Sequence, residues 1–187
     1  MDENECIRQV LAGDQAAYRM LVEKYKNQVF GLAYKMLGGA EDAEDAAQEV
    51  FVRAYTRLRT YDQSRKFSTW LLSITSHLCI DELRRKRLLW HPLDDVAGVL
   101  ESGEKGPETE AIDEEERRRV RNLLQYLPPK YRTVIVLRYW HDLSIIEIGE
   151  AIGATEAAVK TMLHRGRQML AKRMLEKEAN SNALSTC

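Results

Sequence analysis

An acidic segment in the middle of the chain constrains the fold most, because it separates two stretches that can each form a hydrophobic core. Residues 91–116 carry a net charge of −9 and contain two prolines and three glycines. Like charges repel, and too little apolar surface follows Leu100 to offset the entropy of ordering. We therefore expect a flexible acidic linker over 91–116, whose last acids open the next helix at the positive end of its dipole.

Basic segments lie on both sides of this linker, although the whole chain of 187 residues has a net charge of only −1. Residues 61–90 carry a net charge of +3 and residues 117–187 carry +7, whereas residues 1–60 carry −2. The nearly neutral total therefore does not argue against nucleic acid as a partner.

Composition excludes several classes of protein. The chain is 44% apolar and 30% charged, no stretch approaches the roughly 18 apolar residues of a membrane span, and its first residues lack the pattern of a secretion signal. We expect a cytoplasmic protein without membrane insertion. Cys6, Cys79 and Cys187 lie far apart without a Cys-x-x-Cys pair, so neither a disulfide scaffold nor a metal site is expected.

The first module, residues 1–90, has the periodicity of an all-α bundle. Apolar residues recur at spacings of three and four over 10–37 and 43–58, and again in a third helix after Ser68. No stretch alternates as a β-strand does. The expected core is Tyr18, Leu21, Val22, Tyr25, Val29, Leu32, Ala43, Ala46, Ala47, Val50, Phe51, Ala54, Tyr55, Leu58, Trp70, Leu71, Ile74 and Leu78.

The second module, residues 117–176, has the pattern of a helix-turn-helix. Two prolines end its first helix, and an apolar helix follows over 131–139. A serine and a glutamate then form a capping box, a glycine suits a tight turn, and a threonine can cap the last helix. These marker residues are Pro128, Pro129, Ser144, Glu147, Gly153 and Thr155. We expect residues 177–187 to form a polar, frayed tail.

The outer face of the last helix carries side chains that are long enough to reach phosphates and base edges. They are Lys160, Thr161, His164, Arg165, Arg167 and Gln168. An ordinary solvated face is the alternative interpretation. The capping box, the glycine turn and the +7 charge of this module favour DNA binding.

Two groups of residues in the first module could also bind partners. Phe67 to Trp70, followed by the cations of 84–87, combine aromatic rings with positive charge and suit single-stranded nucleic acid, unless the rings are simply core. Asp45, Gln48 and Glu49 form a polar stripe opposite the core. A docking surface or plain solvation explains this stripe better than catalysis, because no histidine or glycine-rich loop accompanies it.

Together these motifs resemble those of bacterial sigma factors of the extracytoplasmic-function (ECF) group, within the sigma-70 family. The resemblance covers about residues 5–90 and 112–175, and the order and spacing of the motifs carry it. The motifs are Asp45-Ala-Ala-Gln48-Glu49-Val-Phe51, Phe67-Ser-Thr-Trp70-Leu71, Ile80-Asp81-x-Leu83-Arg84-Arg85, Leu127-Pro-x-Lys-Tyr-Arg132, Ser144-x-x-Glu147-Ile-Gly149 and Val159-Lys-Thr161. The resemblance implies a two-domain transcription initiation factor without catalytic residues or a cofactor. Its implied partners are RNA polymerase core (the β and β′ subunits), promoter DNA and an anti-sigma factor.

The resemblance also assigns roles to individual residues. The positions that match the polymerase-binding motif are Asp45, Gln48, Glu49 and Phe51. Those that match the motifs for opening and reading the minus-ten promoter element are Phe67, Ser68, Thr69, Trp70, His77, Arg84, Arg85 and Arg87. Those that match the helix in the major groove of the minus-thirty-five element are Lys160, Thr161, His164, Arg165 and Arg167.

Two positions depart from the family pattern. His77 stands where such factors often carry asparagine, which leaves the minus-ten base preference open. Met162 stands where arginine is common, which implies one fewer phosphate contact. Two alternatives to a sigma factor remain: a free-standing helix-turn-helix transcription factor, which needs only the second module, and a sigma-like regulator that binds a partner without DNA.

Overall fold

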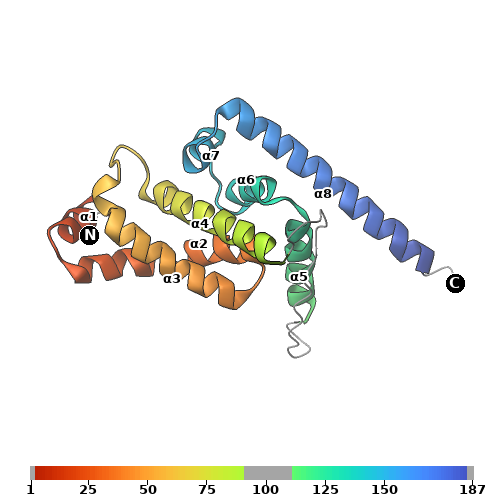
Figure 1. Cartoon of the computed structure of the whole chain (residues 1–187), viewed down its shortest axis with the longest axis horizontal. Helices are drawn as coiled ribbons and strands as arrows, with labels where there is room; N and C mark the ends of the chain where they lie inside the picture. Colours follow the sequence, from red (N-terminus) through yellow and green to blue (C-terminus); the bar gives the residue numbers. More distant parts are fainter. Residues whose placement is uncertain (1–2, 91–110, 185–187) are drawn as a thin grey trace.

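The computed structural model describes residues 3–90 and 111–184, which are helical apart from short turns (Figure 1). Within these ranges there is no β-strand, which confirms the all-α expectation. The elements are α1 (Glu3–Leu11), α2 (Gln15–Leu37), α3 (Ala40–Arg57), the short 3₁₀ helix η1 (Leu58–Thr60), α4 (Phe67–Trp90), α5 (Ala111–Tyr126), α6 (Pro129–Trp140), α7 (Ile145–Ile152) and α8 (Glu156–Leu184). Most of the predicted linker, 91–110, lies outside the described residues. Its last acids, 113–116, belong to α5, as expected.

The N-terminal part of the first module contains two helices where the periodicity predicts one. The expected single helix over 10–37 is wrong, because α1 ends at Leu11 and α2 begins at Gln15. Gly13 has a φ of +101°, and the Asp14 carboxylate accepts a hydrogen bond of 2.8 Å from the Ala16 amide. A left-handed glycine followed by an aspartate N-cap is the local reason for the break.

Helix α4 is the central element of the structure. It contacts α2 and α3 of its own module, and it contacts α6 and α7 of the second module. Leu71, Leu72 and Cys79 are buried along it. Tyr55 was expected in the core but is 43% exposed. Its ring packs against Tyr18, with 4.9 Å between ring centroids, and lines a surface pocket.

The second module contains the predicted helix-turn-helix as α7 and α8. The capping box is present: the Glu147 amide donates to Ser144 Oγ (3.2 Å), and the Ser144 amide donates to Glu147 Oε2 (2.8 Å). Gly153 has the left-handed φ of +69° that the turn requires. Thr155 Oγ1 accepts from the Ala158 amide at 3.3 Å and so caps α8. The prediction made from these signals is confirmed.

The predicted polar, frayed tail over 177–187 is helical in its described part, 177–184. Helix α8 continues without a break to Leu184. No glycine or proline occurs between Gly166 and that residue, and an ion pair of 3.6 Å between Arg173 and Glu176 supports the distal turns. In Figure 1 the distal part of α8 extends past the rest of the second module.

The two modules pack directly against each other. Helix α2 contacts α5 and α6, and α4 contacts α6 and α7. The buried residues of both modules form one cluster. We call the contact region between the modules the seam. The acidic segment alone gave no indication of the seam, because charge repulsion in a linker predicts modules that are held apart.

Candidate polymerase and DNA interfaces

The polar stripe of α3 lies opposite the core, as its spacing predicts. Asp45, Gln48 and Glu49 are exposed, whereas Val50 is fully buried. Glu49 forms an ion pair of 2.7 Å with Arg53, one turn later. Asp45 and Gln48 have no hydrogen-bond partner among the described residues. Their polar groups are therefore available to another molecule.

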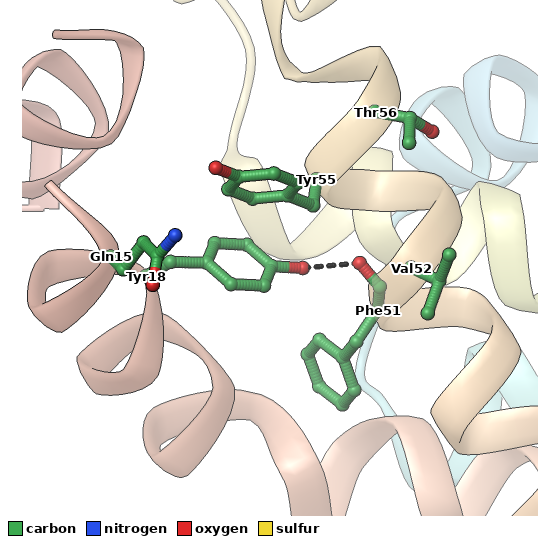
Figure 2. Close-up of a pocket in the computed structure, with 6 residues that line it drawn as sticks. All are labelled: Gln15, Tyr18, Phe51, Val52, Tyr55 and Thr56. Atoms are coloured by element: carbon green, nitrogen blue, oxygen red, sulfur yellow. Dashed lines mark hydrogen bonds between the residues drawn. The ribbon is translucent and has the colours of Figure 1, made fainter. Parts of the chain in front are cut away.

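An apolar pocket of about 380 Å³ continues this stripe toward the start of α2 (Figure 2). The Tyr18 hydroxyl donates to the backbone carbonyl of Phe51, and burial raises the pKa of Tyr18 to about 12, so that the phenol stays a donor. Val52 is 59% exposed beside it. The residues that line the pocket are Gln15, Tyr18, Phe51, Val52, Tyr55 and Thr56. Exposed apolar side chains beside a polar stripe are typical of a protein-binding surface.

Sequence reasoning assigned Phe51 to this surface but missed Tyr18 and Tyr55, which it placed in the core. Phe51 is half-buried, and its carbonyl oxygen is held by Tyr18. The spacing of residues could have placed Tyr55 on this surface. Tyr55 follows Gln48 by seven residues and Val52 by three, and these spacings put all three on one helix face.

The aromatic residues at the start of α4 are mainly structural. Phe67 is 1% exposed and packs on Tyr61 and Trp70, with ring centroids at 5.3 and 5.5 Å. Thr69 is 5% exposed, and Ser68 and Trp70 are half-buried. The Phe67 ring is enclosed by other aromatic side chains, which fits the alternative interpretation that this ring is core.

The basic end of α4 keeps several side chains at the surface. His77, Arg84, Arg85 and Arg87 are exposed, and His77 Nδ1 lies 2.8 Å from the carbonyl oxygen of Ser73.

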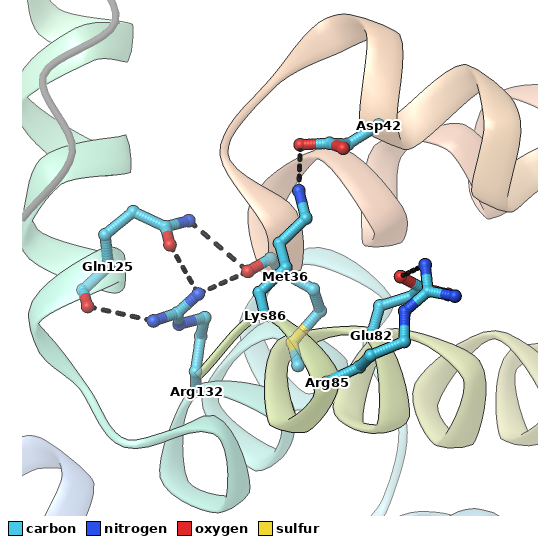
Figure 3. A network of polar contacts seen from close by, with 7 residues as sticks. All are labelled: Met36, Asp42, Glu82, Arg85, Lys86, Gln125 and Arg132. Atoms are coloured by element: carbon cyan, nitrogen blue, oxygen red, sulfur yellow. Dashed lines mark hydrogen bonds and ion pairs between the residues drawn. The ribbon is translucent and has the colours of Figure 1, made fainter. Parts of the chain in front are cut away.

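Glu82 and Lys86 lie one turn apart at this end of α4, but each pairs with another side chain (Figure 3). Glu82 pairs with Arg85 at 2.7 Å, and Lys86 pairs with Asp42 of α3 at 2.6 Å. Arg84 has no ion-pair partner among the described residues, so a net positive surface remains at this end of α4.

The outer face of α8 is exposed along its first three turns. Its side chains there are Lys160, Thr161, His164, Arg165 and Arg167. Gly166 is buried on the opposite side, where an added Cβ would lie 3.0 Å from Ile135 Cγ1 of α6. The absence of a side chain thus lets α8 approach α6 closely and present its basic face outward.

Arg165 and Met162 of α8 each lie beside other residues of the second module. A hydrogen bond from Arg165 lowers the pKa of the Tyr131 hydroxyl, with a further contribution from Lys130. Met162 is half-buried against the core.

The described residues contain no group of three potential metal ligands among histidine, cysteine, aspartate and glutamate. Within the same ranges, no helix combines the length and apolar character needed to cross a bilayer.

Comparison with known proteins identifies both modules. The family model for Sigma-70 region 2 matches residues 21–88, and that for Sigma-70, region 4 matches residues 117–170. The ECF RNA polymerase sigma factor SigW of Bacillus subtilis is 41% identical over 90% of this chain and 94% of its own length. The ECF RNA polymerase sigma factor SigE of Mycolicibacterium smegmatis is 34% identical over 92% of this chain and 68% of its own length.

Two solved structures show the same fold. CnrH, in complex with the cytosolic domain of CnrY, aligns with a TM-score of 0.68 at 24% identity, over 92% of this chain and 96% of that one. RpoE of Bartonella quintana, in complex with the anti-sigma factor NepR, aligns with a TM-score of 0.62 at 13% identity, over 83% and 94%. The order of the motifs, the two family matches and the nearly full-length similarity to SigW together show that the chain belongs to the ECF RNA polymerase sigma factors.

Proposed function

We propose that this sigma factor uses three separate faces to start transcription: α3 binds RNA polymerase core, α4 binds the minus-ten element, and α8 reads the minus-thirty-five element. The observation that supports the proposal most is the arrangement of exposed groups. The polar stripe of α3, the basic end of α4 and the outer face of α8 lie on different helices, each backed by core. No catalytic residue is needed, since the factor positions the polymerase.

The polymerase face combines Asp45, Gln48 and Glu49 with the apolar pocket beside Phe51. Two polar groups without internal partners and a pocket lined by tyrosine rings suit a partner that offers both donors and apolar side chains. We assign this face to the polymerase clamp, formed by the β and β′ subunits.

We propose that the residues of the minus-ten face have two different roles, structural support and DNA contact. Phe67 and Thr69 are buried and support the start of α4, whereas the accessible edge of Trp70 and the Ser68 hydroxyl contact DNA. His77 lies further along the helix, and the exposed cations Arg84, Arg85 and Arg87 hold the phosphates of the opened strand.

The minus-thirty-five face reads duplex DNA from the major groove. Lys160, Thr161 and His164 begin the exposed face, and Arg165 and Arg167 complete it. Arginine is the side chain that most often makes a bidentate contact to guanine. Arg165 is the candidate for such a contact, because it is exposed near the middle of this face.

An anti-sigma partner is also proposed. CnrH and RpoE, which share this fold, were both solved with a partner, CnrY in one case and the anti-sigma factor NepR in the other. Work with polymerase at promoter DNA would place the protein in the cytoplasm.

The proposal is tested by transcription from a promoter library with purified core polymerase, with and without this chain. Promoter-specific transcripts that depend on the chain are the expected result. A free-standing helix-turn-helix factor would instead bind duplex DNA and leave core polymerase without specific initiation. A sigma-like regulator without DNA contacts would do neither.

A further inference from the structure

Helix α1 lies outside the part of the chain that matches Sigma-70 region 2, yet it packs tightly on the first module. That match begins at residue 21, whereas α1 ends at Leu11. Cys6, Ile7 and Val10 are buried, and α1 contacts both α2 and η1. Helix α1 therefore belongs to the packed body of this module, beside the segment that precedes α4.

The side chain of Glu3 reaches from the first turn of α1 to two adjacent residues of α2. Its Oε2 accepts a hydrogen bond from the Tyr25 hydroxyl and forms an ion pair of 2.6 Å with Lys24 Nζ. Burial raises the pKa of Tyr25 to about 12, with a further contribution from its bond to Glu3, so the phenol stays a donor at neutral pH. The outer end of the Tyr25 ring is thereby held from α1.

The Tyr25 ring in turn packs against the aromatic residues at the start of α4. Its centroid lies 5.4 Å from that of Phe67, and the Phe67 centroid lies 5.5 Å from that of Trp70. The Tyr61 ring completes the group, at 5.3 Å from Phe67 and 5.2 Å from Trp70. We call these four rings the aromatic cluster. The Tyr61 hydroxyl donates to the carbonyl oxygen of Arg65, so both tyrosines of the cluster are tethered at their hydroxyls.

The two tethered tyrosines restrain the two rings of α4. Phe67 has no polar group, so the packing of its neighbours sets the orientation of its ring. Protein interiors are close-packed, and one ring cannot shift unless the rings in contact with it shift too. A displacement of Tyr25 is therefore transmitted through Phe67 to Trp70, which is half-buried and keeps an accessible edge.

We propose that Glu3 is a positioning residue for promoter opening: through the Tyr25 ring, its carboxylate holds Trp70 in the orientation in which that ring meets the opened minus-ten strand. Glu3 itself does not contact DNA in this proposal. The role in opening rests on the proposed function of the minus-ten face, whereas the restraint on Trp70 rests only on the contacts within the first module. The alternative is a contact that stabilises α1 on α2 and has no effect on Trp70.

Three variants isolate the hydrogen bond, and a fourth is the matched control. Glu3→Ala removes the acceptor, and Tyr25→Phe removes the donor but keeps the ring. Glu3→Gln loses the ion pair with Lys24 but keeps an acceptor oxygen, so it should behave like the wild type. Glu5→Ala is the control, because Glu5 also lies in the first turn of α1 but pairs with Arg8 of its own helix, at 2.6 Å.

Trp70 fluorescence tests the restraint in the full chain without DNA. The chain has three tryptophans, so Trp90→Phe and Trp140→Phe leave Trp70 as the single reporter. In this background, Glu3→Ala and Tyr25→Phe should raise the acrylamide quenching constant about twofold, because the cluster loses a charge-assisted hydrogen bond that restrains it. The Glu3→Gln and Glu5→Ala variants should match the parent, and circular dichroism should show unchanged helix content. Equal quenching in all four variants would overturn the proposal.

Open-complex formation with core polymerase tests the role in initiation. A hydrogen bond to a charged group shifts an equilibrium by about tenfold or more, so Glu3→Ala and Tyr25→Phe should open a duplex promoter from the library about three- to tenfold more slowly than the wild type. On the same promoter with its minus-ten region already unpaired, both variants should approach the wild-type rate, and their affinity for core polymerase should be unchanged. Glu3→Gln should restore opening of the duplex. Equal losses on both templates would indicate a general loss of stability and would contradict the positioning role.

The variant Trp70→Ala separates this inference from the proposed function. If Trp70→Ala slows opening and Glu3→Ala does not, the positioning role of Glu3 is refuted and the minus-ten face stands. If neither variant slows opening, the DNA contact of Trp70 is refuted together with the inference that depends on it. Slower opening in both, with rescue by Glu3→Gln, is the result that supports the proposal.

Discussion

A single methyl group added at Gly149 should disrupt the helix-turn-helix. Gly149 is buried in α7, and a Cβ there would lie 2.6 Å from the backbone oxygen of Ala154. That oxygen belongs to the turn, whose Ala154 amide donates to Gly149 O at 2.9 Å. Because the obstacle is backbone and not the end of a flexible side chain, the turn itself must move.

The magnitude follows from two opposing effects. Alanine stabilises a helix interior by about 0.5–1 kcal/mol relative to glycine, whereas overpacking a tight site costs about 1–3 kcal/mol. We expect Gly149→Ala to lower the free energy of unfolding by about 1–2 kcal/mol. Gly31→Ala in α2 is the matched control, since its Cβ would meet only Lys35 Nζ at 4.0 Å, and it should gain about 0.5–1 kcal/mol.

Thermal unfolding followed by circular dichroism measures both variants. A change of 1 kcal/mol corresponds to about 2–4 °C in Tm for a chain of this size, so the two variants should move in opposite directions. Gly149→Ala should also weaken binding to upstream duplex DNA, because the turn sets the angle of α8. If Gly149→Ala is as stable as Gly31→Ala, the close approach to the turn is not a real constraint.

Three further predictions concern charged and polar groups. The hydrogen bond from Lys66 and the capping contacts of Ser144 lower the pKa of Glu147 to about 2, from an ordinary value of 4.5. The stability that this carboxylate contributes is therefore present above pH 4.5 and is lost as the pH falls toward 2. Glu147→Gln should flatten the pH dependence of the free energy of unfolding between these values. Replacing both Gln48 and Glu49 with alanine should weaken binding to core polymerase while helix content is unchanged; equal affinity would refute the α3 assignment. If Arg165 contacts a base, Arg165→Ala should weaken the free energy of binding to the upstream element by about 1–3 kcal/mol. If Arg165 contacts only phosphate, the variant should bind all sequences more weakly, and the slope of log K against log salt concentration should fall by about one.

The features that the sequence predicted correctly depend on local chemistry. Ser144 and Glu147 satisfy each other's neighbouring amides within one turn, and Gly153 adopts a conformation that glycine favours. The exposed face of α8 follows from helical spacing once Val159 and Leu163 are placed in the core. Interactions that span three or four residues can be inferred without knowledge of the fold.

The features that the sequence did not reveal depend on distant partners. Phe67 becomes core because Tyr25 and Tyr61, from other parts of the chain, enclose its ring. Tyr55 becomes surface because its ring, which packs against Tyr18 of α2, lines an open pocket. The seam joins Arg132 to Met36, which are 96 residues apart, and a motif that contains an arginine gives no sign of whether that arginine faces solvent, DNA or another module.

The position of Arg132 explains how a buried guanidinium without a carboxylate partner among the described residues can be tolerated. Met36 lies in the last turn of α2, and Gln125 lies in the last turn of α5, so Arg132 donates to carbonyls that have no partner within their helices. The negative ends of two helix dipoles thus take the place of a counter-ion. Arg132 also donates to the carbonyls of Gln125 and Leu127 in its own module. The same guanidinium therefore caps the end of α5 and, through the Met36 carbonyl, joins the second module to the end of α2.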